Sequence, residues 1–362
     1  MGDMKSTFCD LVKLPSPSGK ELAVALYVRD YLERLGYRTR IDDAGRRCES
    51  NTGNLIATIG DGKPKAAFIA HMDTVQDAAD VVRPVIKNGV ARSDGTTILG
   101  ADDKAGVAAM LEAARELSSG AGKSALFVFS IREERGCMGV KYLDIGRGIK
   151  YVFDIDGSGR IGDFINRSLG YTDFELTISG KAAHAALSPE KGSDAIRTAG
   201  LVISKLPLGR NKDGGTMNLG TISGGSAPNI VPAHLRLFGE VRGFSSVSIE
   251  KKLEVVRKTA NYACRITGCR YKLAKGNSAP PFHTKPGSTI LDLARRGCSK
   301  SGIRFNTVTT YSTIQGSILS KRGYEVLGIC RGGKDQHSKS ESIMLSEIEM
   351  TKRLVLGIIS CL

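Results

Sequence analysis

Short, continuous apolar segments alternate with helical segments along the first part of this 362-residue chain. Strand-like runs occur at 65–70, 124–131 and 150–155, and apolar residues recur at helical spacing over 20–35 and 104–118. A strand that is apolar on both faces must be covered on both faces, which requires helices above and below an open sheet. The pattern therefore predicts an α/β fold of the doubly wound type.

The pattern changes at about residue 169. The predicted elements then follow in the order β-α-β-β-α-β, which is the ferredoxin-like α+β plan, and the α/β pattern resumes near residue 279. We therefore expect a discontinuous larger domain formed by 1–168 and 279–362, with 169–278 inserted as a smaller domain. Edge strands of such a small sheet often pair with another copy, so this insertion is expected to form a homodimer.

The charge and composition narrow the class of protein. Lys and Arg number 52 against 37 Asp and Glu, which gives a formal charge of +15. A basic balance attracts anionic partners, but the basic residues are scattered, Trp is absent and no aromatic RNA-binding signature occurs. Nucleic-acid binding is therefore the weaker interpretation, and it would predict an affinity that falls steeply with salt.

The sequence also predicts a compartment. No apolar run reaches the roughly 18 residues of a membrane-spanning helix, and the first residues lack the pattern of a signal peptide. We expect a cytoplasmic protein with no membrane partner. The eight Cys include no Cys-x-x-Cys pair, so reduced and mostly structural thiols are expected.

Histidines and acidic residues gather where predicted strands end. His71 directly follows one strand, and Asp73 stands two residues later, where its carboxylate can support an imidazole that faces a metal. In a parallel sheet these strand ends collect at one edge. Adjacent carboxylates such as Glu133 and Glu134 repel each other unless a cation lies between them. The full set is His71, Asp102, Glu133, Glu134, Asp156 and His337.

Each of these residues alone is more often structural, for example as a helix cap at Asp102. Together they form a nitrogen and oxygen ligand set that suits two divalent ions, with zinc expected and cobalt or manganese as alternatives. Asp102 has the natural position for a carboxylate shared by two ions. Such ions lower the pKa of bound water, and a spare Glu can accept its proton. The sequence therefore predicts a hydrolytic site.

The chain resembles the M20 family of metallopeptidases, in its peptidase T-like branch. The resemblance extends from PSPSG at 15–19 to the last loop, so it covers nearly the whole chain. The matching stretches are HMDTV (71–75), LGADDKAG (99–106), REE (132–134), DG (156–157), GKAAHA (180–185), PEKG (189–192), NIVP (229–232) and QHS (336–338) with Glu341.

The resemblance implies roles for individual residues of the larger domain. His71, Asp102 and Asp156 would hold one metal ion. Asp102 would also hold the second ion, together with Glu134 and His337. Glu133 would be the general base, and Asp73 would orient His71.

The same resemblance makes the inserted domain a lid that also forms the dimer. His184 would reach the partner subunit's active site and stabilise an oxyanion there. Asn229 would contact the substrate, and Arg242 stands where the family often binds the substrate carboxylate. One departure concerns the substrate pocket: Gln315 stands where the family usually has an Asp.

The resemblance implies a small peptide substrate, and the most specific expectation is a tripeptide aminopeptidase. An N-acyl amino acid deacylase stays open because the Gln315 segment departs from the family pattern. A non-catalytic metal-binding paralogue is the third alternative. The sequence disfavours it, because Glu133 and every ligand position are present.

Overall fold

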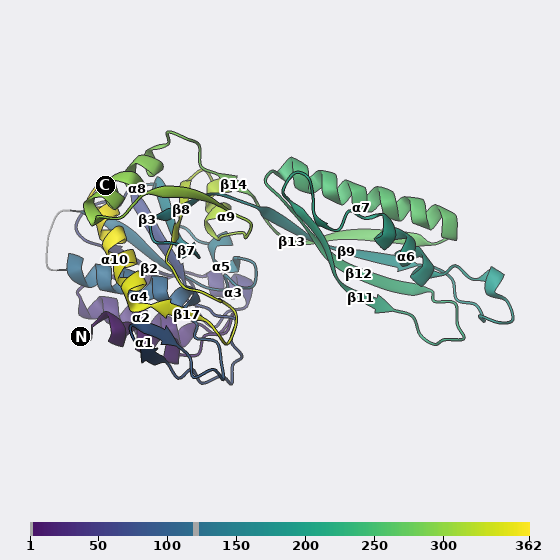
Figure 1. Cartoon of the computed structure of the whole chain (residues 1–362), viewed down its shortest axis with the longest axis horizontal. Helices are drawn as coiled ribbons and strands as arrows, with labels where there is room; N and C mark the ends of the chain where they lie inside the picture. The colour runs from purple at the N-terminus through teal and green to yellow at the C-terminus, as the bar shows by residue number, and fades with distance from the viewer. Residues whose placement is uncertain (1–2, 119–122) are drawn as a thin grey trace. The chain divides into compact units, whose positions relative to one another are not determined.

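The computed structural model describes residues 3–118 and 123–362, and the chain divides into two compact units (Figure 1). The large unit comprises Met1–Arg167, His283–Thr310 and Ile314–Leu362. The inserted unit comprises Ser168–Phe282 together with Tyr311–Thr313. The predicted insertion, 169–278, lies within the inserted unit, whereas the short return of the chain at 311–313 was not predicted.

The large unit is built on a mixed sheet. Its central strands β6, β3, β7 and β16 are parallel, and the antiparallel strands β2 and β8 flank them. In order across the sheet, the strands are β1 (Thr39–Ile41), β2 (Leu55–Ile59), β6 (Ala125–Ser130), β3 (Ala66–His71), β7 (Tyr151–Gly157), β16 (Glu325–Cys330), β8 (Asp163–Ser168) and β14 (Phe282–His283), with β15 (Asn306–Thr310) paired to β8.

The central strands are buried because they are apolar on both faces. Every residue of β3 and β6 is buried. Phe68 stacks on Phe153 with 5.1 Å between ring centroids and meets Phe127 edge-on at 5.8 Å. These contacts join three neighbouring parallel strands in one aromatic core layer.

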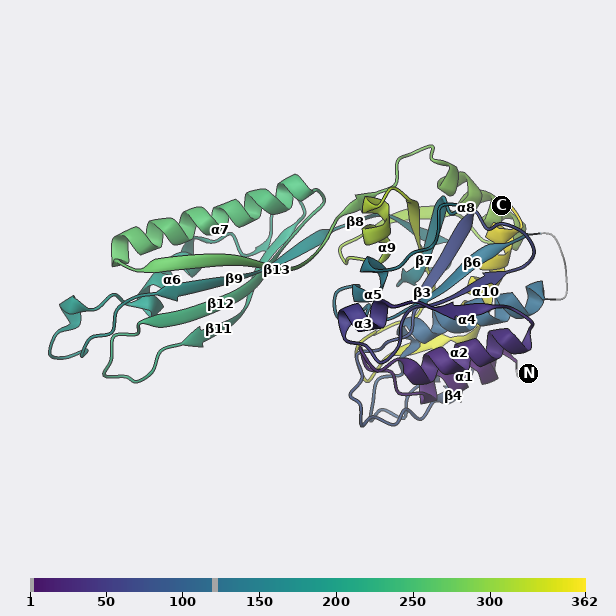
Figure 2. The ribbon, with the colours of Figure 1, turned by 180° about the vertical axis from the view of Figure 1, so that it is seen from behind.

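Helices cover both faces of this sheet (Figure 2), as the sequence predicts. Helix α4 packs on β3 and β7, and α1 and α10 pack against α4. Helix α9 contacts β7 and β16. The helices of the large unit are α1 (Met4–Lys13), α2 (Leu22–Arg34), α3 (Ala44–Cys48), α4 (Ala101–Leu117), α5 (Met138–Lys141), α8 (Thr289–Ser301), α9 (Gly316–Lys321) and α10 (Leu345–Ile359).

A second, small sheet of the large unit was not predicted. It consists of β4 (Val85–Lys87), β5 (Val90–Arg92) and β17 (Ser342–Met344), all paired antiparallel. Strands of three residues leave too short a pattern to be found by periodicity. This sheet ties the loop after His337 to the segment that precedes α4.

The inserted unit has the predicted ferredoxin-like order, with one further two-residue edge strand, β10 (Gly209–Arg210), that was not predicted. Its strands pair antiparallel in the order β10-β11-β12-β9-β13, and α6 and α7 pack on one face over a separate apolar core. The elements are β9 (Gly170–Ser179), η1 (Pro189–Lys191), α6 (Ala195–Lys205), β10 (Gly209–Arg210), β11 (Thr216–Gly224), β12 (His234–Gly243), α7 (Ser246–Thr267) and β13 (Arg270–Ala279).

Strand β9 shows why this unit has one covered face. Its residues alternate between buried and half-buried positions along the whole strand, and Phe174, Leu176 and Ile178 point into the core. Among the described residues, no helix is both long and apolar enough to cross a membrane.

Candidate metal centre

The predicted ligands of the large unit come together at one edge of its sheet. His71 is the last residue of β3, Glu133 and Glu134 follow β6, and Asp156 lies near the end of β7. Because β6, β3, β7 and β16 are adjacent and parallel, their carboxyl ends lie side by side. Asp102 joins them from the first turn of α4.

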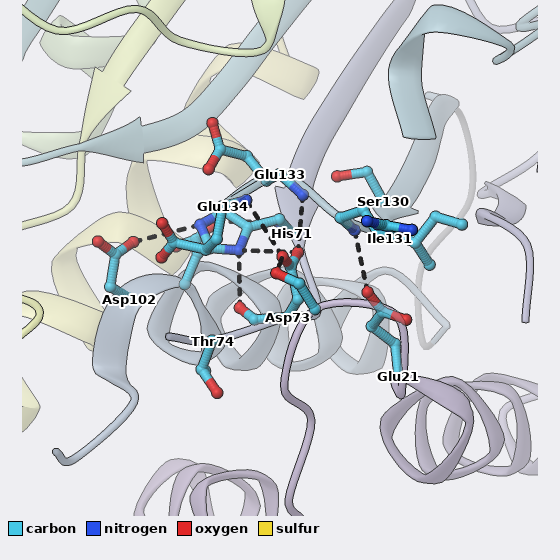
Figure 3. Close-up of polar contacts among 12 residues, drawn as sticks. Glu21, His71, Asp73, Thr74, Asp102, Ser130, Ile131, Glu133 and Glu134 are labelled. Atoms are coloured by element: carbon cyan, nitrogen blue, oxygen red, sulfur yellow. Dashed lines mark hydrogen bonds and ion pairs between the residues drawn. The ribbon is translucent and has the colours of Figure 1, made fainter. Parts of the chain in front are cut away.

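Asp102 connects two groups of ligand atoms. Its Oδ1 lies 3.3 Å from His71 Nε2, and its Oδ2 lies 3.3 Å from His337 Nε2. His71 Nε2 is also 3.5 Å from Asp156 Oδ1, and His337 Nε2 is 2.9 Å from Glu134 Oε1. Figure 3 shows His71 with Asp102 on one side of its ring and Asp73 on the other.

These distances fit the edges of metal coordination shells. Bonds of about 2.0–2.2 Å place two neighbouring tetrahedral ligands roughly 3.4 Å apart. The four histidine–carboxylate distances, 3.3, 3.5, 3.3 and 2.9 Å, lie near that value. Glu134, Asp102 and His337 form one group of convergent ligand atoms. His71 belongs to a second group with Asp103 and Asp156, and to a third with Glu133 and Glu134. The donor set therefore fits divalent cations.

Asp73 contacts both His71 and the turn after β6 and fixes their positions. His71 Nδ1 lies 2.9 Å from the Asp73 backbone carbonyl oxygen and 3.5 Å from its carboxylate. The carboxylate accepts hydrogen bonds from the backbone N–H groups of Glu133 and Glu134, at 2.9 and 3.1 Å, and from the Ser18 hydroxyl at 2.5 Å. One buried side chain thus positions both a histidine and the turn that bears two glutamates.

The loop before α4 is held in place by Glu341. Its carboxylate accepts hydrogen bonds from the backbone N–H groups of Gly100 and Asp102, at 2.7 and 3.0 Å. Gly100 has a φ of 74°, and a Cβ there would lie 3.2 Å from the Thr74 side chain. A glycine at this position therefore permits the turn that presents Asp102. His337 itself has a left-handed φ of 61°, a strained conformation of the kind that gathers at functional sites.

The electrostatics show how strongly the centre concentrates negative charge. Burial raises the pKa of Glu133 well above its usual value, and nearby Asp156 raises it further. Burial opposes protonation of His71, but Asp102 and Asp156 hold its pKa well above its usual value. Hydrogen bonds to Asp102 and Glu134 raise the pKa of His337 to about 10. Without bound cations, protons balance part of the carboxylate charge.

The sequence predicted no role for two charged residues of this cluster, the fully buried Asp103, which converges with His71 and Asp156, and Arg331. Arg331 follows β16 directly, its side chain is 1% exposed, and its guanidinium contacts Asp102 and Asp103. The sequence signal that could have indicated Arg331 was its position directly after a predicted strand, where the other site residues also lie. Gln315 is buried as well, and its amide oxygen accepts a hydrogen bond of 2.6 Å from Ser130.

The remaining predicted residues belong to the inserted unit. His184 and Asn229 lie together, because His184 forms an isolated bridge with Ile230 and the Ala185 N–H donates to the Asn229 carbonyl oxygen. His184 is exposed, and its Nδ1 accepts from two backbone N–H groups, which leaves Nε2 for another contact.

Arg242 lies apart from this pair, near the opposite end of β12. Glu240 holds its guanidinium through hydrogen bonds of 2.8 and 3.0 Å. The structure thus brings His184 and Asn229 together and separates Arg242 from both.

Known proteins resemble this chain over nearly its whole length. The protein YqjE of Bacillus subtilis is 30% identical, with 97% of this chain and 96% of that protein covered. The crystal structure of the aminopeptidase PepT from Bacillus cereus superposes with a TM-score of 0.90 at 30% identity, covering 98% of this chain and 97% of that one. A Staphylococcus aureus tripeptidase gives a TM-score of 0.92 at 29% identity, covering 99% and 97%.

Two family models match parts of the chain. The peptidase dimerisation domain of the M20 family matches residues 166–266, and the model for peptidase family M28 matches residues 54–202. The chain belongs to the M20 peptidase family. It lies in the peptidase T-like branch of that family, which confirms the predicted resemblance.

Membership of the M20 family identifies the general activity of the chain and the roles of its two units. As an M20 protein, the chain is a metal-dependent peptidase, with a catalytic unit and a lid. The dimerisation-domain match covers most of the inserted unit, from the end of β8 through nearly all of α7. The large unit, which holds the convergent ligand atoms, is the catalytic one.

Proposed function

We propose that this M20 protein is a dinuclear tripeptide aminopeptidase. The observation that supports two metal positions is the bridging geometry of Asp102, whose two oxygens each face a different histidine at 3.3 Å. His71, Asp102 and Asp156 would hold one ion, and Asp102, Glu134 and His337 would hold the other. Zinc is the expected metal, with cobalt or manganese as alternatives. Two such ions, when bound, would polarise the substrate carbonyl and lower the pKa of a water molecule.

Glu133 is proposed as the general base. Its backbone N–H is fixed by Asp73, and its Oε1 accepts a hydrogen bond of 3.1 Å from the Cys137 thiol. These two contacts hold the carboxylate beside His71 and Glu134, with which it forms one group of ligand atoms. From there Glu133 would accept a proton from water and return it to the leaving amine.

The lid residues support a homodimer in which two copies share each active site. Arg242 lies eight residues beyond His234 along β12, which corresponds to about 27 Å, whereas His184 and Asn229 lie near the His234 end. An extended tripeptide spans only about 11 Å. If Arg242 binds the substrate carboxylate and His184 the oxyanion, they must therefore belong to different copies.

The tripeptide substrate is supported by relatives whose names describe an aminopeptidase and a tripeptidase, each superposing over nearly the whole chain. The deacylase alternative keeps the same metal centre and changes the pocket. The observation behind this alternative is Gln315, a neutral residue at a position where the family pattern has an acidic one. A cytoplasmic location, and the absence of nucleic-acid and membrane partners, remain part of the proposal.

A hydrolysis panel followed by mass spectrometry tests the proposal. Metal-loaded protein is incubated with di-, tri- and tetrapeptides and with N-acyl amino acids. We expect release of the N-terminal residue from tripeptides, abolished in Glu133→Gln and retained in the control Glu254→Gln, whose carboxylate pairs with Arg257 on α7. Cleavage confined to N-acyl compounds would contradict the aminopeptidase proposal and support the deacylase alternative. No cleavage by the metal-loaded protein would favour a non-catalytic paralogue.

A further inference from the structure

Arg331 is a buried cation inside the candidate metal centre. It is the largest of the fully buried side chains among the described residues. Its Nη2 lies 2.5 Å from Asp102 Oδ1, its Nε lies 2.6 Å from Asp103 Oδ1, and its Nη1 donates to the Gly332 carbonyl oxygen at 3.3 Å. A buried guanidinium is unfavourable unless it is paired, and these two carboxylates supply the pairing. The peptidase mechanism proposed above gives Arg331 no role.

Arg331 is placed unequally with respect to the two metal positions. It contacts Oδ1 of Asp102, which is the oxygen that faces His71. The other oxygen, Oδ2, faces His337. An ion held by His71 and Asp156 would therefore share its Asp102 oxygen with Arg331, whereas an ion held by His337 and Glu134 would not.

Sharing that oxygen has two physical consequences. A carboxylate oxygen has two lone pairs, so it can accept a guanidinium N–H and still bind a metal ion. The guanidinium nevertheless withdraws part of the negative charge of Asp102, and it repels a second cation placed within a few ångströms in a site of low dielectric. Both effects weaken the ion at the His71 position more than the ion at the His337 position.

We propose that Arg331 is a fixed cation of the metal centre that makes its two positions unequal, so that the Glu134–His337 position fills first and the His71–Asp156 position fills at higher metal concentration. The inference rests on the proposed dinuclear function and adds a residue to it. Its consequence is a chain that holds one ion tightly and gains its second ion according to the supply of free metal. Without metal, the single positive charge of Arg331 offsets part of the negative charge of Asp102 and Asp103 and thereby stabilises the empty centre.

Metal titration tests this inference without reference to catalysis. Metal-free protein is titrated with Co²⁺, and binding is followed by equilibrium dialysis and by visible absorption. We expect two classes of site on the wild-type chain, with dissociation constants at least tenfold apart. In Arg331→Met we expect the weaker class to tighten at least tenfold. Arg331→Lys retains a cation and should keep the two classes apart.

Two single-site backgrounds locate the effect. In His337→Ala, which leaves the His71 position, adding Arg331→Met should still tighten Co²⁺ binding at least tenfold. In His71→Ala, which leaves the His337 position, the same change should alter the dissociation constant less than threefold. The metal-induced rise in melting temperature should likewise be larger in Arg331→Met than in the wild type, because the variant's empty centre contains unpaired carboxylates.

Several results would overturn the inference. Two sites with equal Co²⁺ dissociation constants on the wild-type chain would overturn it, even if Arg331→Met does not fold. Unchanged Co²⁺ affinity in Arg331→Met would show that Arg331 serves only to pair Asp103. Binding of two unequal ions without peptide cleavage would leave the inference standing and remove the peptidase proposal. Absence of any Co²⁺ binding would remove the dinuclear centre and this inference with it.

Discussion

The Asp73 carboxylate accepts a hydrogen bond from the backbone N–H of Glu133, with 2.9 Å between the two heavy atoms. The same carboxylate lies 3.5 Å from His71 Nδ1. A proposed metal ligand and the proposed general base therefore depend on a single buried side chain. Loss of that side chain should affect metal binding and turnover together.

Asp73→Asn is predicted to lower both metal affinity and peptidase activity, each by about 10–100-fold. An Asn amide group replaces one acceptor oxygen by an N–H₂ donor, which faces the N–H and O–H donors already present. Equilibrium dialysis and steady-state kinetics measure the two quantities. Ser18→Ala, which removes only one donor to Asp73, is the matched control and should have a smaller effect. A variant that loses activity with unchanged metal affinity would contradict the shared role.

Two inactive variants are predicted to restore each other's activity when they form one dimer. Glu133→Gln lacks the base, and His184→Ala lacks the lid histidine. A heterodimer purified through two different tags has one site with both wild-type residues if His184 acts on the partner subunit. We expect roughly half of the wild-type activity from such heterodimers. Heterodimers as inactive as the parent homodimers would contradict the sharing of sites between subunits.

The Asp213–Lys252 ion pair predicts a pH dependence for the stability of the lid. Burial favours the neutral carboxyl, but Lys252, 2.5 Å away, and Ser248 together outweigh it and lower the pKa of Asp213 to about 2. A depressed pKa contributes stability above the usual value near 4, and this contribution is lost as the pH falls through about 2.

Urea unfolding measures this contribution. The difference in unfolding free energy between the wild type and Asp213→Asn should be constant above about pH 5 and shrink as the pH approaches 2. High salt should reduce the difference, because Asp213 is partly exposed. Glu250→Gln, which removes an exposed ion pair with Lys275, is the control. A difference that does not change with pH would contradict the assignment.

The aromatic layer of the catalytic unit predicts a large loss of stability on truncation. Phe68 is fully buried and contacts Phe127 and Phe153. Phe68→Ala should lower the unfolding free energy by about 3–5 kcal/mol, because it leaves a cavity between three strands. Phe68→Leu should cost less, because it refills most of the volume. Equal stabilities of the two variants in denaturant titrations would contradict tight packing at this layer.

The sequence predicted most of the fold because the central strands are apolar on both faces. The 65–70 and 124–131 runs correspond to β3 and β6, and the order of elements in the lid is as predicted apart from the two-residue strand β10. The antiparallel edge strands of the large sheet were not distinguished from parallel ones, since periodicity does not reveal strand direction. The three-residue strands β4, β5 and β17 gave no periodic signal.

The sequence predicted most of the side chains that gather at this sheet edge, and less of their surroundings. The His71 and Glu133 motifs have fixed spacings, so they were found before the structure. Arg331 was missed because a single arginine after a strand is ordinary in a basic chain, and only the three-dimensional contacts distinguish it. The pairing of Arg242 with Glu240 could have been predicted from the sequence, because residues two apart lie on the same face of a strand.

Anomalous X-ray diffraction of crystals saturated with zinc would show whether Asp102 bridges two metal ions. We expect two anomalous peaks about 3.5–4 Å apart, one beside His71 and Asp156 and the other beside Glu134 and His337, with the Asp102 carboxylate between them. A single peak at saturating zinc, or peaks that do not contact Asp102, would contradict this expectation.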